Sequence, residues 1–242
     1  MTAARNAAAG AAPAQPFDYR FACEVPEDFV PLPRAGTDEE WREALRELLP
    51  KAEEDALHLA AAALQEALAR LTPENTVRTA LCVGHRDDTL VLGFLSVSVA
   101  HTGHRNDLVA AETVYRTLRQ DLIGSGDGAA VTPIDRPRAK GVQGPQDTIL
   151  AVRLPCGPAV SLTSLRAMVL PRPPGAQAEV RVGVANQQLI VPAPDTWSLY
   201  VTLFTPTLAH VDLFGAQLAA IGRTVTFDVP SPAAPGQDGK HD

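Results

Sequence analysis

Apolar and polar residues alternate through the last quarter of the chain. Valines alternate with polar or small residues over 180–184, which is the pattern of a strand with one buried face. After a break at 192–195, the alternation resumes over 197–203. We therefore expect two strands here, and Pro206 ends the second because proline cannot donate to a strand ladder.

A helix and a short strand are predicted to complete this closing unit. Apolar residues recur at helical spacing, so one face of the helix would carry Leu208, Val211, Phe214, Leu218 and Ile221. Gly222 can cap this helix. Renewed alternation at 225–229 indicates a last strand.

Further strands are predicted in the earlier part of the chain. A short first strand covers 17–21, and an extended segment punctuated by prolines follows it. Two runs joined by a polar turn, 77–83 and 90–100, predict a hairpin. Residues 90–95 are apolar on both faces, so we expect that strand to be central and covered on both sides. Two more strands are predicted over 148–154 and 159–170.

The first helix has the clearest start signal in the chain. Thr37 and Glu40 have the spacing of a capping box, in which each side chain bonds the backbone of the other residue. Trp41 lies on the apolar stripe that follows, so we expect it in the core. Pro50 interrupts this helix or opens a second one, whose stripe continues over 57–71.

A third helix is predicted over 108–122, with an apolar stripe that begins at Leu108 and a cap at Asn106 or Asp107. Strands in series with inserted helices indicate an α+β fold, a mainly antiparallel β-sheet flanked by helices. We expect one domain over 17–229 and disordered tails at both ends, Ala-rich over 1–16 and Pro/Gly-rich over 230–242, because neither tail can bury enough apolar surface. The prolines and glycines of 129–146 give no readable pattern.

Charge and cysteine usage exclude several classes of protein. The 242 residues carry a formal net charge of −7 and no dense basic cluster, so neither nucleic acid nor an anionic membrane surface is an expected partner. No run approaches the ~20 apolar residues of a membrane-spanning helix. The three cysteines form no CxxC pair, which predicts reduced structural thiols in a cytoplasmic protein.

Two stretches carry a resemblance to a known family. They are VPEDFVPLP at 25–33 and VRVGVANQQLIVPAPDTWSLYVTLFTPTLAHVDLFGAQLAAIGRTVTF at 180–227. In both, the chain resembles PsbP-like α/β sandwich proteins, and in particular an actinobacterial branch. In that family an aromatic-rich strand is followed by a short helix and a terminal strand that ends in an aromatic residue, here Phe227. The chain departs from the family in its longer helical pair at 38–71, and in His210, where tryptophan is more typical.

The resemblance implies a non-catalytic role, because proteins with this fold mostly bind other proteins. They include photosystem subunits, nuclear-transport cofactors and adaptor chaperones of secreted effectors. We therefore expect a protein-interaction domain that uses no cofactor. Its partner would be another protein or a second copy of the chain, and a secretion-associated adaptor or chaperone is the specific version.

The alternative is a small-molecule-binding protein or a metal-assisted hydrolase. His101 and His104 lie three residues apart with Asp107 close behind, and these side chains could ligate zinc if a loop folded them inward. A histidine pair of this spacing is not specific, and a polar loop between a strand and a helix accounts for the same residues. We expect no metal site.

Two other motifs carry less chemistry. The glycine-rich run at 124–128 follows a helix, whereas phosphate-binding loops lie between a strand and a helix. Cys156 is flanked by prolines, and His210 and Asp212 are far along the chain, so a structural thiol is the better interpretation. No catalytic residue is predicted.

Three aromatic residues of the strand at 197–203 and its end are candidates for partner contacts. Trp197, Tyr200 and Phe204 belong to the residue types that dominate binding hot spots or interface cores. Tyr200 and Phe204 lie on the opposite face of the strand from Trp197. One face must therefore be covered by a helix of this chain or by a second subunit.

Overall fold

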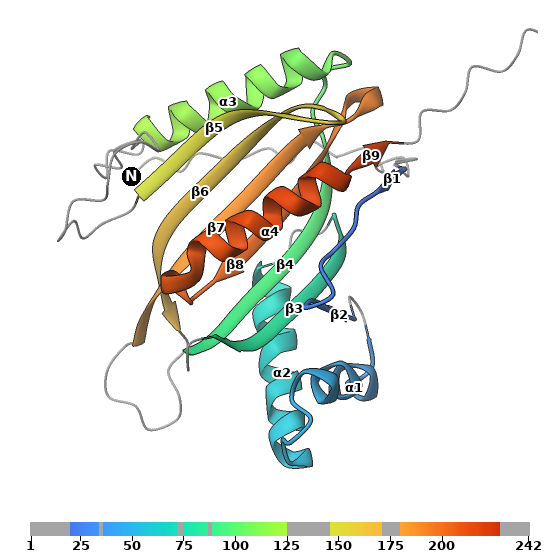
Figure 1. Ribbon diagram of the computed structural model, residues 1–242, viewed down its shortest axis with the longest axis vertical. Coiled ribbons are helices and arrows are strands. Elements are labelled where there is room, and N and C mark those ends of the chain that lie inside the picture. Colours follow the sequence, from blue (N-terminus) through green and yellow to red (C-terminus); the bar gives the residue numbers. More distant parts are fainter. Residues whose placement is uncertain are drawn as a thin grey trace, which may run out of the picture.

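A large antiparallel sheet forms the centre of the computed structural model (Figure 1), which describes residues 20–33, 36–71, 75–86, 89–124, 146–170 and 180–227. Its strands are β2 (Val30–Leu32), β3 (Thr76–Arg86), β4 (Thr89–His101), β5 (Gln146–Leu154), β6 (Gly157–Leu170), β7 (Val180–Pro192) and β8 (Trp197–Thr205). They lie in the order β2-β3-β4-β8-β7-β6-β5. A separate small sheet pairs β1 (Phe21–Ala22) with β9 (Thr226–Phe227).

Four α-helices accompany the sheet in the described residues, so the predicted α+β class is confirmed. They are α1 (Asp38–Leu48), α2 (Glu54–Leu71), α3 (Asp107–Gly124) and α4 (Val211–Thr224), with short 3-10 turns η1 (Pro194–Thr196) and η2 (Leu208–His210). In the part of the chain that the structure covers, no helix combines the length and apolarity needed to cross a membrane. The predicted tails at 1–16 and 230–242, and most of 129–146, lie outside the described residues.

The helices cover the two faces of the sheet separately. α4 packs on one face against β7 and β8, and it lies along the front of the sheet in Figure 1. The other face carries α1 and α2 near β3 and β4, and α3 near β5, β6 and β7. Because neighbouring residues of a strand point to opposite sides, Leu95 packs with the α4 cluster while Phe94 packs with Trp41 of α1. The central position predicted for this strand is confirmed.

The predicted capping box begins α1. The Glu40 amide donates to Thr37 Oγ1 at 3.4 Å, and the Thr37 amide donates to Glu40 Oε2 at 2.7 Å. The first turn of the helix is therefore satisfied locally, and Trp41 follows it directly into the core. Pro50 lies in the connection between α1 and α2, so it interrupts the helix rather than opening the next one.

Replacing Thr37 by alanine is expected to lower the free energy of unfolding by about 1 kcal/mol, because one helix-terminal amide loses its acceptor. Urea denaturation of the full chain measures this change. Thr113→Ala is the matched control, since the Thr113 hydroxyl bonds the carbonyl of Val109 inside a helix and caps nothing. Equal losses for the two variants would contradict a capping role for Thr37.

Two expectations about the closing helix are wrong. α4 continues through Gly222 to Thr224, and Gly222 serves close packing instead of capping. A Cβ at this position would lie 2.5 Å from Cδ2 of Leu189. Leu208 lies in η2, before α4 begins, and is exposed because it does not continue the buried face of the helix.

Candidate functional site

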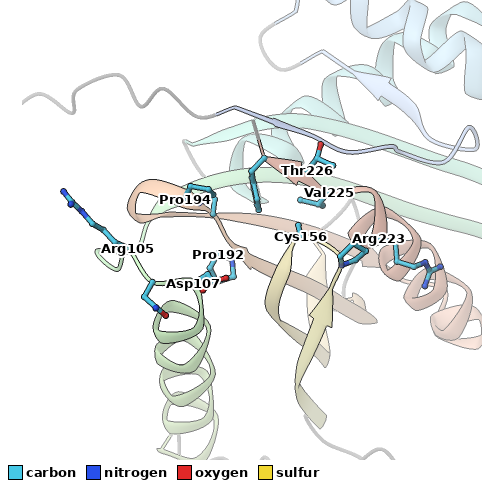
Figure 2. A pocket seen from close by; sticks show the side chains of 12 residues that line it. Arg105, Asp107, Cys156, Pro192, Pro194, Arg223, Val225 and Thr226 are labelled. Carbon is cyan, nitrogen blue, oxygen red and sulfur yellow. The ribbon is translucent and has the colours of Figure 1, made fainter. Parts of the chain in front are cut away.

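A pocket of about 580 Å³ opens at one end of the sheet (Figure 2). Three connections meet there, namely the β4–α3 loop, the β5–β6 turn and the β7–β8 connection, together with the C-terminal end of α4 and β9. They meet because β4, β5 and β7 all run in the same direction in this antiparallel sheet, so their C-terminal ends lie at the same end of the sheet. The fold thus gathers residues from four distant parts of the sequence.

The pocket has an apolar wall and a polar rim. The wall is formed by Pro155, Pro192, Ala193, Pro194, Val225 and Phe227. The polar or reactive residues are Arg105, Asn106, Asp107, Cys156, Arg223 and Thr226. In Figure 2, Arg105 and Arg223 lie at opposite ends of the pocket, with their charged ends directed outward. Prolines hold the wall in place because their rings fix the backbone φ angle.

Thr196 ties two of the connections together. Its carbonyl oxygen accepts from the amide of Thr102 at 2.7 Å and from the Thr102 hydroxyl at 3.2 Å. Its own hydroxyl lies 2.8 Å from Nε2 of His101. Thr196 has a φ of 73°, a strained conformation for a β-branched residue. The pocket rim is therefore held by specific contacts between the β4–α3 loop and the β7–β8 connection.

The two candidate metal-binding histidines lie beside the pocket without lining it. His101 bonds Thr196, and His104 is half-buried in the loop before α3. Among the described residues, His, Cys, Asp and Glu side chains form no group of three or more that could hold a metal ion. Asn106, not Asp107, caps α3, because Oδ1 of Asn106 accepts a hydrogen bond from the amide of Val109, three residues along, at 3.0 Å. In this structure the loop is hydrogen-bonded to Thr196 and begins helix α3.

Cys156 lines the pocket as a free thiol. Burial raises the pKa of this thiol above its ordinary value, so at neutral pH it is protonated and a poor nucleophile. His210 and Asp212 lie at the start of α4, whereas the pocket contacts its end. The 14-residue helix separates them by roughly 20 Å at 1.5 Å per residue. The described side chains therefore form no Cys–His–Asp arrangement here.

The three aromatic candidates occupy different places. Trp197 is buried, with the rings of Phe21 and Phe227 at 6.2 and 5.4 Å from its own. Tyr200 packs with the α3 cluster, and burial raises the pKa of its hydroxyl. Phe204 stacks on Phe94 at 6.5 Å. Helices of this chain thus cover much of both faces of the sheet. Trp197 is part of the core, whereas Tyr200 and Phe204 are half-buried.

The first turn of α3 exposes two large apolar side chains next to the pocket. Leu108 is 64% exposed and Val109 is 49% exposed, and both directly follow the lining residue Asp107. Leu108 was expected to begin the buried stripe of this helix, and that expectation is wrong. The buried face of α3 begins at Ala110 and Ala111, and Ala111 is the first residue of the helix in the cluster that packs on the sheet.

Sequence reasoning missed most of these residues. Arg105 and Arg223 are single charges in unremarkable surroundings. A usable signal was present in Pro155, Pro192 and Pro194, each of which follows a predicted strand. Strands that run in the same direction place such turns at the same edge, but only a known strand order identifies which turns meet.

Comparison with protein-family models gives no match, and comparison with curated proteins gives none.

Proposed function

We propose that this chain is a non-catalytic protein-binding domain whose contact region is the sheet-end surface, defined as the pocket together with Leu108 and Val109. The observation that carries the proposal is the exposure of these two side chains directly beside a preformed pocket with an apolar wall. Single exposed leucines are common, whereas apolar groups clustered at a pocket are typical of binding sites.

The energetics of the surface favour a macromolecular partner. Burying apolar surface contributes about 25 cal/mol per Å², and the pocket wall is already ordered by prolines and by the bonds to Thr196. Little conformational entropy is then lost on binding. Leu108 lies outside the pocket lining, so only a ligand that extends over the rim can cover it.

The resemblance to PsbP-like proteins supports the same class of function. An adaptor or chaperone of a secreted protein is the specific version that we propose, acting in the cytoplasm, where the three free cysteines stay reduced. A second copy of the chain could also fill the role of partner. Light scattering of the purified protein tests that case directly.

Small-molecule binding in the pocket is the second candidate function. The volume of about 580 Å³ lies within the range of roughly 300–1,000 Å³ typical of small-molecule sites. Such a ligand would sit between the prolines and would not need Leu108. Dependence of binding on Leu108 therefore separates the two candidates.

The test is cross-linking in native lysate followed by quantitative mass spectrometry, with wild type, Leu108→Asp and the control Leu59→Asp. Leu59 is 71% exposed on α2, away from the pocket. We expect Leu108→Asp to reduce the captured partner at least tenfold and Leu59→Asp to leave it unchanged. An aspartate in the first turn is favourable for the helix, so the fold should persist, and urea denaturation checks this.

Two results would count against a protein partner. One is a set of cross-linked proteins that Leu108→Asp leaves unchanged. The other is the absence of any reproducible cross-link together with a monomeric mass. A small molecule retained by wild type and by Leu108→Asp in native mass spectrometry would favour the second candidate.

A further inference from the structure

We infer that the sheet-end surface recognises an acidic peptide segment with an apolar side chain at its centre, an inference that rests on the proposed function. Arg105 and Arg223 lie at opposite ends of the pocket in Figure 2. Both are exposed, and neither forms an ion pair with a described carboxylate. Arg42 and Arg46 of α1, in contrast, share Glu54 between them.

The local charge balance at the pocket is positive. Its lining contains two guanidinium groups and one carboxylate, that of Asp107. Oδ1 of Asp107 accepts a hydrogen bond from the amide of Leu108 at 2.7 Å. Part of the negative charge of this carboxylate is therefore engaged by the start of α3. The two arginines are therefore available to a ligand, and guanidinium groups bind carboxylates through paired hydrogen bonds.

The positions of the arginines define the form of the ligand. Between them lie Pro192, Pro194 and Val225 of the apolar wall, and this wall suits an apolar side chain. An extended segment across the pocket would place that side chain on the wall and bring acidic residues on either side to Arg105 and Arg223. Leu108 and Val109 would widen the apolar contact at the Arg105 end.

The net charge of the chain does not prevent this recognition. The formal charge of −7 is spread over the whole surface, and charges in solution act over only ~8 Å at physiological ionic strength. The nearest charges therefore dominate once a peptide is bound. Binding should weaken as salt is added, because the arginines are exposed.

Selection from a phage-displayed library of random nine-residue peptides, on the full chain, tests the inference. We expect selected peptides to be enriched in Asp and Glu on both sides of an apolar residue. Fluorescence anisotropy with one selected peptide should then show at least a tenfold higher Kd for the double variant Arg105→Glu, Arg223→Glu. Arg119→Glu on α3 is the matched control, because Arg119 is exposed and does not line the pocket.

Selected peptides that are neutral or basic, a Kd unchanged by the double variant, or failure to select any peptide would each overturn the inference. The Leu108→Asp experiment separates such a failure from failure of the proposed function. A cross-linked partner that depends on Leu108, combined with selected peptides that lack acidic residues, would leave a protein-binding domain whose ligand is not acidic.

Discussion

Replacing Phe214 by alanine is expected to lower the free energy of unfolding by about 3–5 kcal/mol, the range for a buried aromatic residue. Phe214 is fully buried at the centre of the α4 face. Its ring lies over Gly93 of β4, and a Cβ at Gly93 would overlap it. Removing the ring leaves a cavity that rigid neighbours on the sheet cannot close. Urea denaturation of the full chain measures the loss.

The glycine beneath the ring provides a second measurement. Gly93→Ala alone should be destabilising, because the added methyl group meets the ring of Phe214. In the Phe214→Ala background the same methyl group should fill part of the cavity, so the double variant should be more stable than the sum of the single losses implies. Additive losses, or a loss below 1 kcal/mol for Phe214→Ala, would contradict this packing.

Arg166→Met is expected to lower the free energy of unfolding by about 2–3 kcal/mol, because it leaves a buried carboxylate without its charged partner. Asp147 of β5 has no exposed side-chain surface, and its two oxygens lie 2.7 and 2.8 Å from Nη2 of Arg166. The hydroxyl of Ser164 donates to the same carboxylate at 2.5 Å. Loss of one partner from a fully buried pair costs roughly 3–5 kcal/mol. We expect a smaller loss here because the Arg166 side chain is 38% exposed.

Arg116→Met is the matched control for this prediction. Arg116 pairs with Glu112 across one turn of α3, and both side chains are largely exposed, so the change should be within about 0.5 kcal/mol. Removing both Asp147 and Arg166 in favour of apolar residues should restore part of the stability. Equal effects of Arg166→Met and Arg116→Met in urea denaturation would show that Asp147 does not depend on its partner.

The elements of this fold were predictable where the signal is local. Thr37 and Glu40 lie three residues apart, and the buried residues of α4, among them Phe214 and Ile221, recur at helical spacing. The expectation for Leu108 was wrong because a periodic stripe does not show which turns of the helix pack on the sheet. Ser96 and Ser98 alternate with apolar residues as solvent-facing residues would, yet both are buried, because this face of β4 lies inside the molecule.

The candidate site was beyond prediction for a different reason. Its pocket depends on β4 lying beside β8, a strand about a hundred residues away, and on α4 ending near the β5–β6 turn. These neighbours are determined by the packing of the whole sheet, so they cannot be inferred from the residues of a single loop. The bond between His101 and Thr196 is an example, since each residue reads alone as an ordinary loop position.

The pairing of β1 with β9 has a consequence for synthesis on the ribosome. Phe21 lies opposite Phe227, and the two rings enclose Trp197. Phe21 leaves the exit tunnel early, but its partner strand is made some 200 residues later, as is Thr224, which accepts the amide of Glu24. The wall of the pocket that contains Phe227 therefore closes only after translation has passed this residue, and a nascent chain cannot yet present the complete sheet-end surface.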